Sequence, residues 1–159
     1  MKPLDRTDFQ IIRLLRNNAR LSNKELAAKV GLAPSTCLVR TRLLQQTGVI
    51  TGFRAEVDAA ALGVGLQAMI AVRLKRHYKP DVEAFRQHAL DLPEVVRLYH
   101  VAGPIDFLAH VWARDPEHLR DLAMTAFTAR EEVSHIETEL IFEHVSSDEL
   151  PPFLGPAPA

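Results

Sequence analysis

The sequence contains little of the chemistry on which most enzymes and metal sites depend. Of its 159 residues only Cys37 is a cysteine. This excludes an internal disulfide and a zinc site built from cysteines, and it is usual in a reducing compartment. There is no G-x-S-x-G motif, no phosphate-binding glycine loop and no H-E-x-x-H pair. We therefore expect a protein that is not an enzyme and needs no cofactor or metal.

Long apolar runs are also absent. No window approaches the roughly 18 uncharged apolar residues of a membrane span. The start, MKPLDRTD, lacks the apolar core of a signal peptide. The apolar fraction of 47% and the charged fraction of 25% are those of an ordinary globular protein. These features predict a soluble protein of the cytoplasm.

The net charge of −1 hides an uneven distribution along the chain. Residues 1–58 hold 10 Lys and Arg against 5 Asp and Glu, whereas residues 59–159 hold 9 against 15. Such an asymmetry suggests that the first part meets a polyanion such as nucleic acid. The alternative is that the basic residues only form a solvated surface.

All seven histidines lie in the acidic part, but their spacing does not resemble that of metal ligands. We interpret most of them as structural or surface residues: His77, His88, His110, His118, His135 and His144. His100 is the exception, because it lies close to a Gly-Pro turn and could tune a ligand pocket with pH. A metal-binding or enzymatic domain is kept as an alternative that stoichiometric metal in the protein would favour.

The first fifty residues predict three short helices. Apolar residues at helical spacing predict the first over 5–17. Ser22 and Glu25 form a capping box that opens a second helix, which stops at Gly31. Pro34 suits the first turn of a third helix, which ends at Gly48. Two helices joined by a short glycine-containing turn form a helix-turn-helix.

The rest of the chain predicts a second, mixed domain. VITGFRAEV, residues 49–57, reads as a strand, and residues 58–65 read as a hinge. Strands are expected over 65–74, 95–103, 106–115 and 135–145, with helices over 81–92 and 117–129. This order, β-α-β-β-α-β, is that of a ferredoxin-like fold, so the chain as a whole is expected to be α+β.

At 100° per residue, the third predicted helix has two distinct sides. Cys37, Thr41 and Leu44 point toward the other helices. The outward side carries a hydroxyl, a guanidinium, an amide and two aliphatic groups, from Ser35, Arg42, Gln46, Leu38 and Val39. Such groups read base edges and thymine methyls in the major groove of DNA. The alternative is that Leu38 and Val39 cover a loop or the second domain.

Leu43 lies to one side of this surface, and we expect it to pack against the strand that follows. Arg40 lies between the two sides, within reach of Asp5 and Asp8. Scaffold and phosphate contact are equally good interpretations of Arg40. Further candidates for phosphate contact, each of which could also be an ordinary surface cation, are Arg20, Lys24 and Arg54.

LAPSTCLVRTRLLQQTGVITGF, residues 32–53, and HVAGPIDFLAHV, residues 100–111, carry a family resemblance. The chain resembles the Lrp/AsnC, or feast/famine, transcription regulators from residue 4 to about 145. The resemblance implies a (winged) helix-turn-helix domain over 1–52, a strand and hinge over 53–64 and a RAM-type effector and oligomerisation domain over 65–146. A proline-rich tail, residues 147–159, follows. Thr36, at a matching position, joins the DNA-contacting candidates.

The resemblance also implies partners. Family members bind double-stranded operator DNA and pair through the second domain into homodimers, which often assemble into tetramers, octamers or higher forms. Their effectors are commonly amino acids, bound where dimers meet. The matching pocket positions here centre on residues 102–106, in which Gly103 would let the backbone approach a ligand and Asp106 would take an amino group or shape the loop. The effector candidates are His100, Ala102, Gly103, Pro104, Asp106, Ile136, Glu137 and Thr138.

Three departures from the family pattern affect what can be transferred to this chain. Ala33 stands where a serine often caps the third helix, at a cost of about 1 kcal/mol. Val39 and Leu43 replace residues that are commonly basic, so phosphate attraction must come from elsewhere. Pro104 stiffens the turn before Asp106. An architectural DNA-bending protein that responds to no effector therefore remains the alternative function.

Overall fold

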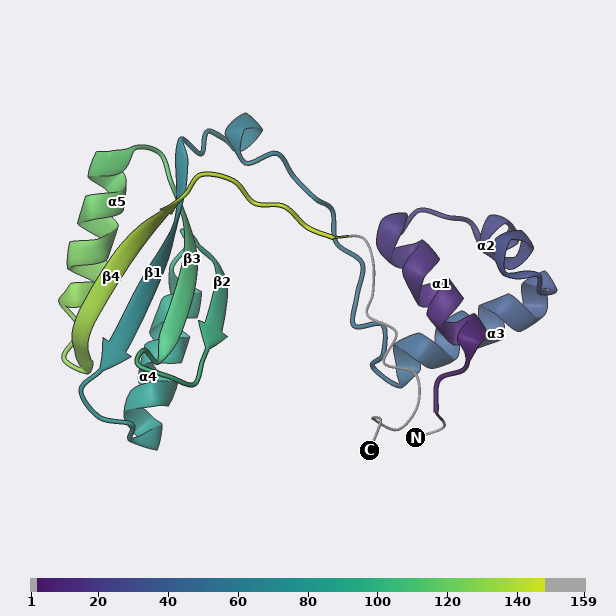
Figure 1. Ribbon diagram of the computed structural model, residues 1–159, viewed down its shortest axis with the longest axis horizontal. Coiled ribbons are helices and arrows are strands. Elements are labelled where there is room, and N and C mark those ends of the chain that lie inside the picture. The colour runs from purple at the N-terminus through teal and green to yellow at the C-terminus, as the bar shows by residue number, and fades with distance from the viewer. Residues whose placement is uncertain (1–2, 148–159) are drawn as a thin grey trace. The chain divides into compact units, whose positions relative to one another are not determined.

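The computed structural model describes residues 3–147 (Figure 1). They form two compact units, one of residues 3–56 with 145–147 and the other of residues 57–144. Most of the predicted proline-rich tail lies outside the described residues. Within them, no helix has the length and apolar character needed to cross a bilayer.

The first unit is a bundle of three helices: α1 (Arg6–Asn17), α2 (Asn23–Val30) and α3 (Pro34–Gln46). Its core is small, and it is filled by two buried side chains from each helix and by the partly buried residues around them. The fully buried members are Ile11, Leu15, Leu26, Ala27, Cys37 and Leu44. The helix-turn-helix prediction is therefore confirmed.

Local capping signals explain where these helices begin. Asp5 and Asp8 form a capping box at α1, and Ser22 and Glu25 form the predicted one at α2. Gly31 ends α2 with φ 68°, a left-handed conformation that favours glycine. Ala33 gives α3 no side-chain cap. Instead, the Asn23 side chain donates to the carbonyl of Pro34 at 2.8 Å and ties the start of α3 to the start of α2.

The strand predicted over residues 49–57 is wrong. No strand lies in residues 3–58, and residues 51–57 have no regular secondary structure. A strand needs a neighbouring strand to satisfy its backbone groups, and the described chain provides none here. Phe53 and Val57 are accordingly exposed.

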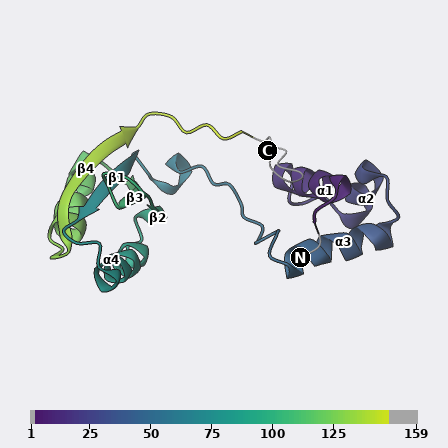
Figure 2. The same ribbon diagram turned by 60° about the horizontal axis from the view of Figure 1, so that its bottom comes forward.

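The second unit is a four-stranded antiparallel sheet with two helical segments, in the predicted β-α-β-β-α-β order. After a single 3₁₀ turn, η1 (Ala60–Leu62), its elements are β1 (Leu66–Leu74), α4 (Lys79–Asp91), β2 (Val95–His100), β3 (Phe107–Ala113), α5 (Pro116–Leu122) and β4 (Val133–Ile141). The spatial order β2-β3-β1-β4 places β1 and β3 in the centre (Figure 2). The α+β, ferredoxin-like fold class is thus confirmed.

Several element boundaries differ from the sequence prediction; β2, for example, ends at His100, three residues before the end of the predicted strand. The second helix continues from α5 as a π-helix, η2 (Ala123–Thr128), in which each turn is wider than in an α-helix. β4 begins two residues before the predicted strand and ends at Ile141, so Phe142 is almost fully exposed.

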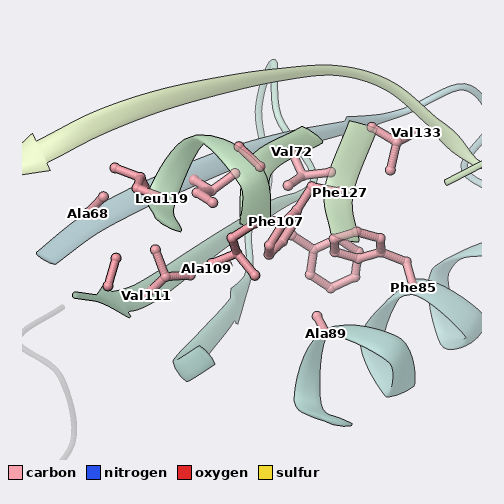
Figure 3. Packing of buried hydrophobic residues seen from close by; sticks show 14 of the residues in the cluster. Ala68, Val72, Phe85, Ala89, Phe107, Ala109, Val111, Leu119, Phe127 and Val133 are labelled. Atoms are coloured by element: carbon pink, nitrogen blue, oxygen red, sulfur yellow. The ribbon is translucent and has the colours of Figure 1, made fainter. Parts of the chain in front are cut away.

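Both helices pack on the same face of the sheet. Phe85 and Ala89 of α4 and Phe127 of η2 meet Phe107 and its neighbours on β3 (Figure 3). The rings of Phe85 and Phe107 lie 4.9 Å apart, in a tilted arrangement that aromatic pairs favour. Neither α4 nor α5 covers the opposite face, which we call the open face of the sheet.

Candidate functional site

Helix α3 has the two sides that its sequence predicts. Cys37 and Leu44 are buried and Thr41 is half-buried, with its hydroxyl donating to the carbonyl of Cys37 at 3.0 Å. The candidate DNA-contacting residues of the other side are all exposed: Ser35, Thr36, Leu38, Val39, Arg42 and Gln46. The fold therefore brings these six side chains together on one helix.

Three large aliphatic side chains are exposed on α3 beside the polar ones. Leu38 is 37% exposed, Val39 65% and Leu43 49%. The expectation that Leu43 packs against a following strand is wrong, because no such strand forms. Leu43 instead is exposed to solvent, as are Leu38 and Val39 on the same helix.

Arg40 is held by both of the aspartates that cap α1. One guanidinium nitrogen lies 2.7 Å from Asp5 and 2.8 Å from Asp8. The two carboxylates raise the pKa of Arg40. The amide of Asp8, followed by Arg40, lowers the pKa of Asp5. Arg40 thus joins α3 to the start of α1. Of the two interpretations of Arg40, scaffold and phosphate contact, these ion pairs correspond to the scaffold.

The other three candidate cations are exposed and lie on different segments. Arg20 is in the α1–α2 loop, Lys24 in the first turn of α2, and Arg54 in the extended residues after α3. Within the described residues, none of these three side chains forms an ion pair with a carboxylate. They remain free to approach phosphates, although their positions alone do not distinguish that role from a solvated surface.

The predicted effector turn connects β2 and β3. Ala102, Gly103 and Pro104 are exposed, and Gly103 has φ 138°. A Cβ atom at Gly103 would meet nothing within 4 Å. Glycine is therefore favoured here by the backbone conformation, and the space beside it is open to a ligand.

Asp106 is the most constrained residue of this turn. It is 4% exposed, and its Oδ2 accepts the Leu74 amide at 2.7 Å. Its Oδ1 lies 2.7 Å from Nδ1 of His77. Asp106 thus ties the end of β1 and the β1–α4 loop to the 102–106 turn. His77 was missed in the sequence, because no local pattern connects it to a residue 29 positions away.

The remaining effector candidates are only partly brought together. The amide of Asp106 donates to the carbonyl of Val72, and Val72 pairs with Ile136 across β1 and β4, so Ile136 lies near the turn. Thr138 lies two residues further along β4. Side chains alternate across a strand, so Glu137 points to the open face of the sheet. His100 stacks on Phe107 with ring centroids 4.7 Å apart.

A cavity of about 290 Å³ opens beside the β1–α4 loop. Its lining is strongly charged, and it includes none of the predicted effector residues. The lining residues are Lys75, Arg76, Asp81, Ala84, Glu131 and Glu132. Arg76 and Asp81 pair with each other at 3.1 Å, so part of this charge is already neutralised.

The open face of the sheet carries a polar network that sequence reasoning also missed. Gln67 Oε1 accepts from Nε1 of Trp112 at 3.1 Å and lies 2.9 Å from Nε2 of His110. Burial lowers the pKa of His110, and the charges of Arg97 and His144 lower it further. The lowered pKa favours the neutral form of His110, on a face of the sheet that neither helix covers.

Comparison with known proteins agrees with this architecture. The family described as Lrp/AsnC ligand binding domain matches residues 67–151, and the one described as Winged helix-turn-helix DNA-binding matches residues 4–51. These two matches correspond to the sheet unit and the helical unit.

Individual relatives match along nearly the whole chain. The HTH-type transcriptional regulator AldR of Mycolicibacterium smegmatis is 44% identical over 91% of this chain and 84% of its own length. The Leucine-responsive regulatory protein of Rhizobium meliloti is 36% identical over 89% and 91%. A transcriptional regulator of Neisseria meningitidis, solved as an L-Met complex, superposes with a TM-score of 0.86 at 28% identity, covering 94% of this chain and 97% of its own.

Proposed function

Since the chain belongs to the Lrp/AsnC family of DNA-binding transcriptional regulators, we propose that it reads its operator through the exposed side of α3. Its relatives regulate transcription and are not enzymes, as the sequence led us to expect. The observation that carries the proposal is the exposure of Leu38, Val39 and Leu43 on a helix whose other side buries Cys37 and Leu44.

The major groove of DNA offers contact partners for these exposed side chains. Thymine methyl groups in the major groove contact aliphatic side chains, and guanine edges accept from arginine. Leu38, Val39 and Leu43 therefore favour a site with thymines, and Arg42 favours a guanine beside them. Arg20, Lys24 and Arg54 would contact phosphates at the edges of the site.

A second copy of the chain would supply a second α3 helix for binding DNA. The open face of the sheet exposes or half-exposes Met69, Leu108, Trp112 and Tyr99, which is apolar surface of the kind that subunits bury. A homodimer formed through this face would present two α3 helices to major grooves one helical turn, or multiples of a turn, apart. Higher assemblies of such dimers, acting on cytoplasmic DNA, form part of the same proposal.

An amino acid is the effector that we propose, bound at residues 102–106 with Asp106 and Ile136 near it. Two relatives support this class of ligand, one by its name, Leucine-responsive regulatory protein, and one by its complex with L-methionine. Within the chain, the open space beside Gly103 and the carboxylate of Asp106 suit a small molecule with an ammonium group.

Fluorescence anisotropy tests the operator proposal. A labelled fragment from upstream of the protein's own gene is compared with a scrambled fragment at about physiological salt, because affinities depend strongly on salt. Selective binding that an amino acid changes is the expected result. Weak binding that is equal on both fragments and indifferent to amino acids would instead favour an architectural protein.

Arg42→Ala identifies what that side chain contacts. If Arg42 pairs with a guanine, the substitution weakens binding to the selected fragment by about 1–3 kcal/mol and leaves the scrambled fragment nearly unaffected. Equal loss on both fragments would assign Arg42 to a phosphate. Arg86→Ala, which removes an exposed arginine of α4, is the matched control.

A further inference from the structure

The pair of His77 and Asp106 joins a very exposed side chain to a buried one. The His77 side chain is 75% exposed, whereas that of Asp106 is 5% exposed. Nδ1 of His77 contacts Oδ1 of Asp106, and the other carboxylate oxygen is held by the Leu74 amide. His77 is therefore the solvent-facing partner of a carboxylate that is otherwise enclosed by the protein.

Oδ1 is also the oxygen at which a ligand would meet this histidine. Oδ2 already accepts the main-chain amide of Leu74 at the end of β1, whereas Oδ1 faces the exposed imidazole of His77. An ammonium group that pairs with Oδ1 from the 102–106 turn would take the position of that imidazole.

We propose that His77 is an internal competitor of the effector: its imidazole occupies Oδ1 of Asp106, and an effector ammonium group binds by displacing it. This inference rests on the amino-acid effector proposed above. It adds a residue that controls how tightly any such effector binds.

The loop that carries His77 is tethered independently of that residue. The Lys75 amide donates to the carbonyl of Glu132 at 2.8 Å, and Arg76 pairs with Asp81. Displacement of the imidazole therefore requires movement of one exposed side chain and its immediate backbone. For the same reason, a His77 variant should keep the fold, and circular dichroism checks this before any titration.

The test compares wild type, His77→Ala and a matched control, His135→Ala. His135 is also exposed and pairs with a carboxylate, that of Glu137 at 3.3 Å, but lies on β4. Each of the proteinogenic amino acids is first screened by thermal shift on all three proteins. Amino acids that shift any of them are then titrated calorimetrically, with L-methionine and N-acetyl-L-methionine included throughout.

His77→Ala is expected to bind the amino acid more tightly. If the imidazole occupies Oδ1 about nine-tenths of the time, its removal strengthens binding by about tenfold. His135→Ala should match wild type, and N-acetyl-L-methionine, which has no ammonium group, should gain nothing from either substitution. In the Asp106→Asn background, checked for folding by circular dichroism, His77→Ala should have no further effect.

The other outcomes separate the inference from the function on which it rests. Equal affinity of wild type and His77→Ala for the same amino acid would overturn the role of His77 and leave the effector proposal standing. Binding to His77→Ala alone would support the competition. If no amino acid shifts any of the proteins, the amino-acid effector fails, and the competition fails with it.

Discussion

Different residues of α3 have different roles, and Arg40 is the one that attaches the helix to α1. Val39 and Arg42 beside it on the helix face solvent, whereas its guanidinium is bound by two carboxylates of α1. Charge-assisted hydrogen bonds of this kind are stronger than neutral ones. They also fix geometry, because the two acceptors lie on the same capping turn. The orientation of α3 on α1 therefore depends on a residue that need not touch a base.

Arg40→Ala should destabilise the helical unit. The substitution removes both ion pairs and leaves the carboxylates of Asp5 and Asp8 facing each other. Because these groups are partly exposed, the free energy of unfolding should fall by only about 1–2 kcal/mol. Urea unfolding of the full chain, followed by circular dichroism, measures it. Arg42→Ala, on the exposed side of the same helix, is the control. Identical unfolding of the two variants would contradict a scaffold role for Arg40.

His110 should make stability depend on pH. Its pKa is lowered in the folded state, mainly by burial, so the unfolded chain binds more protons as the pH falls through the ordinary value of 6.5. The free energy of unfolding should therefore decrease from pH 7 toward pH 5. His110→Gln should show a smaller decrease than wild type. An unchanged pH profile would mean that His110 titrates equally in both states.

At the scale of elements, the start of β1 is fixed by close approach of two backbones. The amide of Gly65 donates to the carbonyl of Ala113 at 3.0 Å. A Cβ atom at Gly65 would collide with the carbonyl oxygen of Arg114. Main-chain atoms at this point cannot move aside as the end of a long side chain can, so glycine is required by space and not by its φ angle.

Gly65→Ala is expected to cost about 3 kcal/mol, at the upper end of what overpacking usually costs. The measurement is the unfolding midpoint of the full chain in urea. Gly52→Ala provides the control, since a Cβ atom there meets nothing within 4 Å and its φ is not positive. Similar stability of the two variants would show that β1 shifts to accommodate the methyl group.

At the scale of the whole molecule, the sheet has two very different faces. The covered face is a continuous core of aromatic and aliphatic residues (Figure 3). On the open face, Met69 lies opposite His110, Gln67 opposite Trp112 and Ala71 opposite Leu108 across β1 and β3. The centre of the open face thus mixes apolar area with hydrogen-bonding groups that are already paired.

Leu108→Lys should convert a dimer into monomers. A charge in the centre of the open face would be desolvated in the assembled form without a partner. Light scattering after size exclusion should give twice the chain mass of 17.8 kDa, or an even multiple of it, for wild type and a lower mass, down to that of the single chain, for the variant. Leu90→Lys, at an exposed leucine of α4, is the control. A dimeric Leu108→Lys protein would place the subunit contact elsewhere.

Local signals in the sequence predicted most of the fold. The capping box at Ser22, the proline at position 34 and the period of the apolar residues each act within a few residues, so they can be read without the structure. The strand over 49–57 failed for the opposite reason. Its composition suits a strand, but pairing depends on a partner that no local pattern supplies.

The candidate sites divide in the same way. The exposed side of α3 followed from helical angles alone. The contact of Asp106 with His77 did not, because it depends on how a loop folds back onto a distant turn. Grouping Glu137 with Ile136 and Thr138 overlooked the alternation of side chains along β4, a pattern that the sequence does contain.

The attachment of Arg40 to α1 has a consequence for how such proteins diversify. The residues that orient α3 and those that can meet bases occupy different sides of one helix. Duplicated copies of the gene can therefore change Leu38, Val39, Leu43 or Arg42 at little cost in stability, because none of these side chains is buried in the helical unit. On the proposal that this side of α3 reads the operator, operator preference can change separately from folding, and exchange of these four side chains between paralogues should transfer it.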